Sequence, residues 1–243
     1  MKILIIVNLL GVYFLSFSAF AELRVVVNTW PPYVDENLPN NGLAMDIVET
    51  AFAKTGRSVS IHVESWPRVL EGVGIGVFDV AGAVWHTDKR AQELEFSKAY
   101  LNNQIKFMKR KDEPIKYERL SDLQGLVIGI VQDFAYEESF LDAKNLVKVP
   151  QNHILQNLLK LVQGEIDLTV GDERALKFQL GRYMKGGLKN LDVLPKPLSV
   201  RGLCIAVSKK NPQHKLIVTS FNKAIAEMKR DGSYDRIVAQ HQH

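Results

Sequence analysis

The sequence contains a single cysteine, Cys204, so no disulfide can form within the chain. This excludes the small disulfide-stapled domains that are common among secreted proteins. Cys204 also lies too far from the amino terminus to be the lipid-attachment residue that follows the leader of a lipoprotein. Because its neighbours are apolar and typical of a strand, we expect Cys204 to be a small buried residue.

Long apolar runs are also scarce, and beyond residue 21 no stretch reaches the ~20 residues that span a bilayer. The one long run, 3–17, follows Lys2 and precedes Ala19-Phe20-Ala21. A basic start, a short apolar segment and small residues two apart are typical of a secretory signal peptide. A retained membrane anchor is the alternative, but the run is short and no basic cluster follows it. We therefore expect residues 1–21 to be a cleaved signal peptide and the remainder to be secreted and soluble.

Blocks of one charge and the common catalytic motifs are absent from the sequence. Lysine and arginine number 31 against 27 acidic residues, and they are spread along the chain, which gives no indication of a nucleic-acid partner. There is no nucleophile elbow, zinc-ligand spacing or phosphate loop. The glycines of the run 72–76 follow a predicted helix rather than a strand, which excludes a dinucleotide fingerprint. We expect no cofactor and no metal, and a mildly positive surface that attracts anionic solutes.

What the sequence does have is a regular alternation of strand and helix patterns. About 220 residues follow the expected cleavage point, enough for one large domain or two small ones. Apolar, β-branched runs predict strands at 23–28, 59–63 and 77–84, with helical spacing between them. Thr87 is placed to cap a further helix that carries Arg90. This order is typical of an α/β unit with a parallel sheet.

The same pattern restarts in the second half of the chain. Strands are predicted at 104–108, 126–131, 166–170 and 203–207. A helix is predicted around Leu155, Leu158, Leu159 and Val162, which we expect to share a buried face, and a long helix over 212–231. The pattern alone therefore predicts two α/β lobes in succession, with helices at the end.

Several short motifs follow one another in a fixed order. They are Trp30-Pro31-Pro32-Tyr33, Gly42 with Asp46, Thr87-Asp88-Lys89-Arg90 followed by Phe96-Ser97, Gly164 with Asp167, and Asp231-Gly232-Ser233-Tyr234. Each motif alone is weak, but the ordered set is specific. It resembles the family 3 extracellular solute-binding proteins, the periplasmic amino-acid-binding components of import systems.

The resemblance implies a periplasmic-binding-protein type II fold, in which two α/β lobes, each a mainly parallel sheet flanked by helices, are joined by two hinge crossovers. We expect the first lobe to comprise 22–108 with 205–243 returning to it, and the second to comprise 109–204. Ligand would bind between the lobes and be enclosed by hinge closure. Family members serve an inner-membrane ABC permease or a sensor receptor, so we expect a periplasmic monomer with such a partner.

Two charged residues are the main candidates for ligand contacts. The family arginine at the place of Arg90 holds the ligand's carboxylate, and a guanidinium suits this role because it gives two parallel hydrogen bonds. A surface pair with Asp88 or Glu93 is the alternative. The family counterpart of Asp172 accepts a hydrogen bond from the ligand's ammonium group. Capping of a helix that begins at Glu173 is the alternative for Asp172, and the two roles are compatible.

Aromatic side chains are the second group of candidates. The resemblance places Trp30, Tyr33, Trp66 and Trp85 at the cleft. Flat rings offer a large apolar contact, a face that attracts cations and a polar edge. A role in the hydrophobic core is the alternative for each of them.

The sequence departs from the family pattern at two places. Gly82, Ala83 and Trp85 stand where amino-acid binders commonly have small hydroxyl residues. Asp133-Phe134 stands where the family often has glycine and hydroxyl residues at a helix N-terminus. We include Ala83 and Phe134 among the expected ligand contacts. The expected ligand is a small polar solute with a carboxylate, an amino acid or related compound, and the departures favour one that is bulkier, aromatic or cationic.

Two other functions remain open beside non-enzymatic capture of a solute for ABC-type import. Some relatives of this fold are cyclohexadienyl dehydratases, and Glu173 beside Asp172 and Arg90 would supply a carboxylate for such chemistry. A stand-alone sensor that reports to a membrane receptor is the other.

Overall fold

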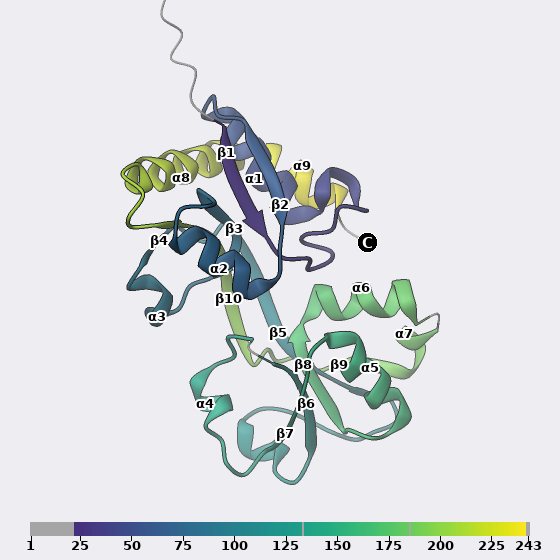
Figure 1. Cartoon of the computed structure of the whole chain (residues 1–243). Helices are drawn as coiled ribbons and strands as arrows, with labels where there is room; N and C mark the ends of the chain where they lie inside the picture. Colours follow the sequence, from purple (N-terminus) through teal and green to yellow (C-terminus); the bar gives the residue numbers. More distant parts are fainter. Residues whose placement is uncertain (1–21, 133, 185, 242–243) are drawn as a thin grey trace, which may run out of the picture.

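The computed structural model describes residues 22–132, 134–184 and 186–241 (Figure 1), so the expected signal peptide lies outside the described residues. The first part of the chain forms β1 (Leu23–Val27), η1 (Pro39–Asn41), α1 (Leu43–Lys54), β2 (Val59–Val63), α2 (Trp66–Gly74), β3 (Val80–Trp85), α3 (Asp88–Ala91), β4 (Leu94–Phe96) and β5 (Leu101–Arg110). The middle part forms η2 (Leu120–Leu123), β6 (Val127–Val131), α4 (Glu138–Leu141), β7 (Val147–Gln151), α5 (Ile154–Gln163), β8 (Leu168–Asp172), α6 (Glu173–Tyr183), α7 (Gly187–Asn190) and β9 (Leu191–Val193). The last part forms β10 (Ser199–Ser208), α8 (His214–Arg230) and α9 (Ser233–Gln240).

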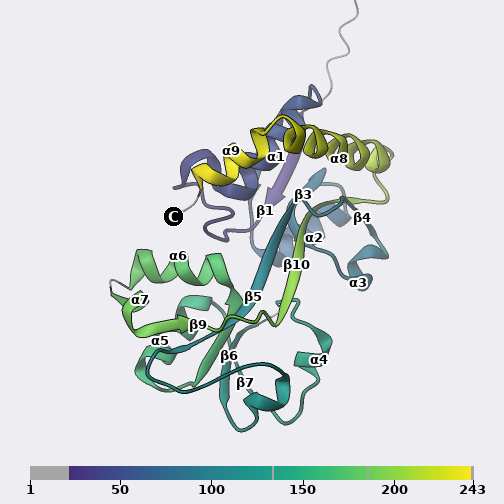
Figure 2. The same ribbon diagram turned by 180° about the vertical axis from the view of Figure 1, so that it is seen from behind.

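These elements gather in two lobes. In Figure 1 the upper lobe holds β1 to β4 and α1 to α3 together with the closing helices α8 and α9, and the lower lobe holds β6 to β9 and α4 to α7. Figure 2 shows from behind that β5 and β10 run side by side between the lobes, and these two strands pair in antiparallel fashion. The predicted two-lobed α/β architecture with two crossing strands is confirmed.

The sheet explains how the two lobes are joined. Its strand order is β2-β1-β3-β10-β5-β8-β6-β7, parallel within β2-β1-β3 and within β8-β6-β7. β5 pairs with β10 over its first half and with β8 over its second half, and Ile105 takes part in both. The expected lobe boundaries, after residues 108 and 204, fall inside β5 and β10. Backbone hydrogen bonds therefore continue through the connection between the lobes.

Several local predictions were wrong in detail. The crossing strands β5 and β10 are longer than predicted, and β8 covers 168–172 rather than 166–170. β3 begins at Val80 rather than at residue 77, because Gly76 has a φ of 80° and the Phe78 N–H donates to the Gly72 carbonyl, which makes a turn after α2. On α5, Leu158 is fully buried as expected, but Leu159 and Val162 are 46% and 42% exposed. The buried face of that helix is completed by Asn157 and Leu161 instead.

The long helix near the end of the chain matches its prediction closely. α8 buries Ile217, Phe221 and Met228 against the first lobe, and Phe52 of α1 packs on Phe221 with ring centroids 5.2 Å apart. At the end of α9, the His241 imidazole lies 2.9 Å from an Asp46 carboxylate oxygen on α1. In the described part of the chain, neither α8 nor any other helix has the length and apolarity needed to cross a membrane.

The lone cysteine also matches its prediction. Cys204 on β10 is 5% exposed, and burial raises the pKa of its thiol to about 11. A buried thiol that stays protonated is chemically inert, which agrees with a packing role.

Candidate ligand-binding site between the lobes

Asp172 ends β8 in the second lobe and caps α6 at the same time. One of its oxygens accepts a hydrogen bond from the Ala175 N–H at 2.9 Å, which is the usual N-cap geometry. The same oxygen accepts a hydrogen bond from the Tyr33 hydroxyl at 2.7 Å, and the other oxygen accepts one from the Asn103 amide at 3.1 Å. Asp172 is only 2% exposed. The capping role is therefore present, together with a contact that joins the two lobes through Tyr33.

The buried position beside Asp172 determines the protonation state of the Tyr33 hydroxyl. Burial raises the pKa of Asp172, although its three hydrogen bonds oppose this. Burial and the adjacent carboxylate both raise the pKa of Tyr33 well above its usual value. The Tyr33 hydroxyl therefore keeps its proton and acts as a donor to Asp172.

Asn103 connects this pair to the tryptophan of β3. Its side-chain oxygen accepts a hydrogen bond from the Trp85 indole N–H at 2.9 Å, while its amide donates to Asp172. Asn103 lies on the crossing strand β5 and is fully buried. Sequence reasoning missed it. The only signal was an asparagine that alternates with the apolar residues Leu101, Ile105 and Phe107 on the buried face of the strand.

Four of the predicted aromatic residues meet beside this network. The loop after β1 turns back on itself because the Tyr33 and Val34 N–H groups both donate to the Trp30 carbonyl. This turn places the ring centroids of Trp30 and Tyr33 4.7 Å apart. Trp30 lies edge-on to Trp85 at 5.4 Å. Phe134 from the second lobe packs against both tryptophans, with its ring centroid 6.3 Å from that of Trp30 and 5.7 Å from that of Trp85. The rings therefore form one cluster across the two lobes.

The loop that carries Trp30 and Tyr33 also depends on Gly42. This glycine has a φ of 95°, and a Cβ atom there would lie 2.7 Å from the Tyr33 carbonyl oxygen. Any other residue would push the loop off α1 and move the ring of Tyr33 away from Asp172.

Arg90 lies next to this cluster. Thr87 caps α3 as predicted, since its hydroxyl accepts a hydrogen bond from the Arg90 N–H. The Arg90 guanidinium donates to the Trp85 carbonyl at 2.9 Å and lies 4.9 Å from the ring of Trp66. Among the residues that the structure describes, neither Asp88, Glu93 nor any other carboxylate pairs with it. Arg90 is thus a half-buried cation held by a ring and a carbonyl.

A second guanidinium, which sequence reasoning missed, approaches the same place. Arg201 on β10 lies 5.8 Å from the ring of Trp85 and donates to the His86 carbonyl at 3.5 Å. It also pairs with Glu137 of the second lobe at 3.3 Å. Burial and the charge of Arg201 both lower the pKa of Arg90. The available signal was a lone charge in an apolar crossing strand.

The remaining predicted positions are less central. Ala83 is buried on β3, two residues before Trp85 and so on the same face of the strand. Asp133 lies outside the described residues. The oxygens of Glu173 are held by Lys106 at 2.8 Å and Lys177 at 2.6 Å. Within the described part of the chain no group of histidine, cysteine and acidic residues is arranged to hold a metal.

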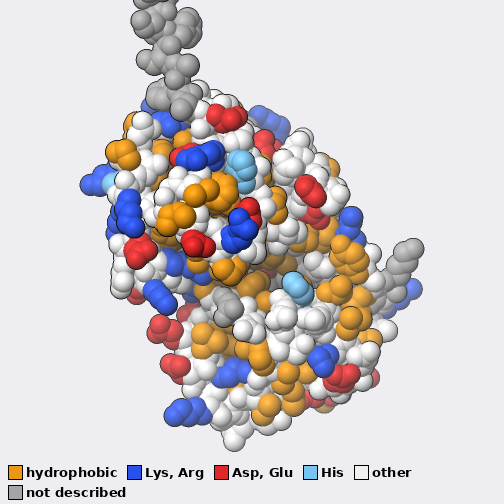
Figure 3. Space-filling view, in the orientation of Figure 1, with side chains coloured by type: hydrophobic (Ala, Val, Ile, Leu, Met, Phe, Trp, Pro, Cys, Tyr) orange, Lys and Arg blue, Asp and Glu red, His pale blue; other side chains and the backbone are white. Residues whose placement is uncertain are grey.

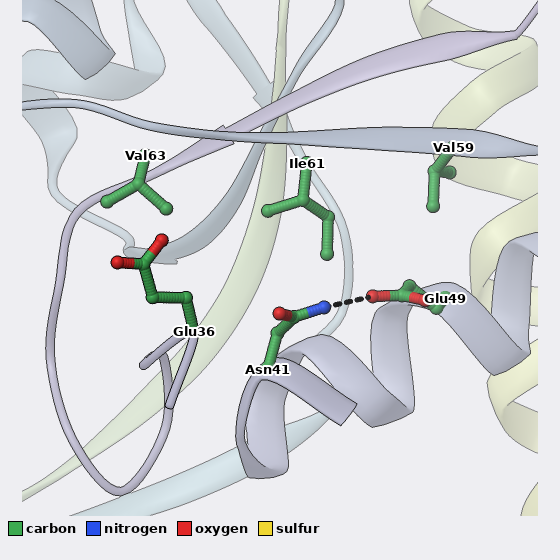
Figure 4. Close-up of a pocket in the computed structure, with 6 residues that line it drawn as sticks. All are labelled: Glu36, Asn41, Glu49, Val59, Ile61 and Val63. Carbon is green, nitrogen blue, oxygen red and sulfur yellow. Dashed lines mark hydrogen bonds between the residues drawn. The ribbon is translucent and has the colours of Figure 1, made fainter. Parts of the chain in front are cut away.

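The surface between the lobes is hollowed, and hydrophobic side chains lie along its edge (Figure 3). A different pocket, of about 320 Å³, lies on the first lobe alone. Figure 4 shows its lining: Val59, Ile61 and Val63 of β2 face Glu36, Asn41 and Glu49. This pocket contains none of the predicted ligand contacts.

Comparison with known proteins assigns the chain to a family. The sequence profile of the bacterial extracellular solute-binding proteins, family 3, matches residues 23–243. The chain is 24% identical to ABC transporter arginine-binding protein 1 of Escherichia coli K12, over 99% of this chain and 98% of that protein. It is 24% identical to a probable histidine-binding protein of Campylobacter jejuni, over 93% of this chain and 88% of that protein.

A solved structure has the same fold. An ancestral arginine-binding protein bound to arginine superimposes with a TM-score of 0.75 at 22% identity, over 93% of this chain and all of that one. The ordered motifs, the two lobes with their crossing strands and the family profile agree, and the chain therefore belongs to the family 3 bacterial extracellular solute-binding proteins.

Proposed function

We propose that this protein captures a small solute bearing a carboxylate, an amino acid or a close relative, between its lobes in the periplasm and presents it to an ABC-type permease. The observation that carries the proposal is the position of Arg90. Its guanidinium is half-buried beside a tryptophan cluster, and no described carboxylate pairs with it. A cation that is partly removed from water without a counterion gains most from an anionic ligand.

Asp172 is the residue that we assign to the ammonium group of the ligand. Its two oxygens offer about four acceptor positions, and Ala175, Tyr33 and Asn103 occupy three of them. A ligand ammonium group takes the remaining position when the lobes open to admit it. The relatives named for arginine and histidine bind molecules with this pair of carboxylate and ammonium groups, which supports the same class of ligand here.

The aromatic cluster supplies the apolar contact. Trp30 and Trp85 come from the first lobe and Phe134 from the second, so a solute between them is touched from both sides. Closure around it buries ring surface and strengthens the polar contacts by excluding water. Binding energy and lobe closure are coupled in this way.

Capture without chemistry fits the site better than a dehydratase does. Glu173, the carboxylate that such an enzyme would need, is ion-paired through both oxygens. The paired lysines lower its pKa despite partial burial. A carboxylate with a lowered pKa is a weak general base and is not protonated at neutral pH, so it is poorly matched to proton transfer.

A thermal-shift screen over amino acids, amines, dipeptides and organic acids tests the proposed function. At about 100 times the dissociation constant, a ligand stabilises the native state by about 2.7 kcal/mol, which corresponds to a rise in melting temperature of about 5 to 10 °C for a chain of this size. We expect at least one α-amino acid to produce such a rise, with sodium chloride at equal ionic strength as the control. A panel in which only compounds without a carboxylate stabilise the protein would contradict the proposal.

A further inference from the structure

Two guanidinium groups converge on one short segment at the end of β3. Arg90, on α3, donates to the carbonyl of Trp85, and Arg201, on β10, donates to the carbonyl of the next residue, His86. Arg201 also lies over the ring of Trp85. The two cations therefore reach the same edge of the aromatic cluster from different elements.

The partners of Arg201 among the described residues leave much of its hydrogen-bonding capacity unused. A guanidinium has five N–H donors in a fixed fork and is best satisfied by a bidentate carboxylate at 2.7 to 2.9 Å. Arg201 instead makes one contact of 3.3 Å with Glu137 and one of 3.5 Å with the His86 carbonyl. Its side chain is only 18% exposed, so water compensates for this deficit incompletely.

Within the part of the chain that the structure describes, the local charge is also unbalanced. Among the described residues, the one carboxylate that pairs with either guanidinium is Glu137, which pairs with Arg201 and whose side chain is 41% exposed. Asp172 is engaged by neutral donors from Tyr33, Asn103 and Ala175. Arg201 lowers the pKa of Arg90, as expected for two cations that repel each other. An anion between them removes this repulsion.

We propose that Arg201 is a second anion contact, and that the ligand carries two acidic groups, one held by Arg90 and the other by Arg201 in the place where Glu137 now pairs with it. This inference rests on the proposed function and narrows its ligand to a small dicarboxylic amino acid. The Glu137 carboxylate then acts as a stand-in that the second acidic group of the ligand displaces.

The opposite role for Glu137 is that of a latch, in which its ion pair with Arg201 holds the lobes together. The two roles give opposite results on removal of the charge. A stand-in competes with the ligand, so Glu137→Gln leaves the affinity for a diacid unchanged or raises it. A latch supports closure, so the same substitution weakens every ligand.

The test is calorimetric titration of L-aspartate, L-glutamate and L-2-aminoadipate, with L-glutamine as the amide matched to glutamate, into the full mature chain. The variants are Arg201→Gln and Glu137→Gln, and Arg119→Gln is the control because Arg119 is 82% exposed on the second lobe. We expect at least one diacid to bind the unaltered protein about ten-fold more tightly than glutamine. Arg201→Gln is expected to remove that preference by weakening the diacid about ten-fold and glutamine less than about three-fold.

Three results would overturn the inference. The first is that the unaltered protein binds mono-acids more tightly than diacids. The second is that Arg201→Gln lowers the affinities for the diacid and for glutamine by the same factor. The third is that Glu137→Gln lowers the affinity for the diacid as much as Arg201→Gln does. That result would show that the Glu137–Arg201 ion pair holds the lobes together. Binding of mono-acids alone leaves the proposed function standing, whereas binding of no amino acid at all removes both.

Discussion

Replacing Arg90 with alanine is expected to weaken ligand binding by a factor of about 10 to 100. The guanidinium is already oriented by the Trp66 ring and the Trp85 carbonyl, so the ligand's carboxylate meets a preorganised donor pair. Alanine removes both charge-assisted hydrogen bonds and leaves the carboxylate half-buried without a partner. Calorimetric titration of the amino acid that gives the largest thermal shift measures the effect directly.

Arg68 provides the matched control for this substitution. It lies two residues after Trp66, is 70% exposed and pairs with Glu64 at 3.1 Å, so it is a nearby guanidinium outside the site. Arg68→Ala should leave the affinity unchanged within error. Arg90 would be removed from the site if Arg90→Ala bound ligand as tightly as the unaltered protein does. The same would follow if Arg90→Ala and Arg68→Ala lost affinity by the same factor.

Replacing Asp172 with alanine is expected to lower the stability of the protein as well as its affinity. The change leaves the Tyr33 hydroxyl and the Asn103 amide buried without an acceptor and removes the cap of α6. Each buried donor without an acceptor costs about 1 to 3 kcal/mol. A loss of about 3 kcal/mol in the free energy of unfolding corresponds to a fall in melting temperature of about 6 to 12 °C, measured by calorimetry in the absence of ligand.

Asp172→Asn gives an intermediate case that tests the hydrogen-bond network itself. Its oxygen still accepts from Tyr33 and Ala175, but its NH2 group then faces the NH2 group of Asn103. Asn103 cannot turn around without leaving the Trp85 indole N–H unbonded. The expected order of melting temperatures is therefore unaltered protein, Asp172→Asn, Asp172→Ala. The exposed Asp192 on β9 is the control, and a melting temperature in Asp172→Ala equal to that in Asp192→Ala would refute the network.

The fold was largely predictable because its signals are local. β-branched runs, helical spacing and the cap at Thr87 each depend on a few neighbouring residues, and they placed most elements correctly. The errors arose where tertiary packing decides the outcome. Leu159 and Val162 lie on a helix face that looked apolar in sequence, yet the second lobe packs against Asn157 and Leu161 instead.

The candidate site was predictable only in part. Trp30, Tyr33, Trp85 and Asp172 came from the family resemblance and Phe134 from a departure from it. The structure brings the four rings together and joins them to Asp172 through Tyr33. Their roles as ligand contacts remain predictions.

Asn103, Arg201 and Glu137 could not be found by the same reasoning. Arg201 and Glu137 are 64 residues apart, and Asn103 and Asp172 are 69 apart. No local pattern in the sequence links partners at such separations. Only the register of β5 against β10, which places Asn103 opposite Arg201, shows that these polar residues share one region.

The most direct test of the central claim, that ligand binds between the lobes, is a titration of intrinsic tryptophan fluorescence. The chain has three tryptophans, and all of them belong to the candidate site: Trp30 and Trp85 in the aromatic cluster and Trp66 against Arg90. We predict a saturable change in emission whose dissociation constant equals the calorimetric one and which Arg90→Ala shifts to higher concentration. Calorimetric binding with unchanged emission would contradict the claim and would place the ligand elsewhere, for example in the pocket between β2 and α1.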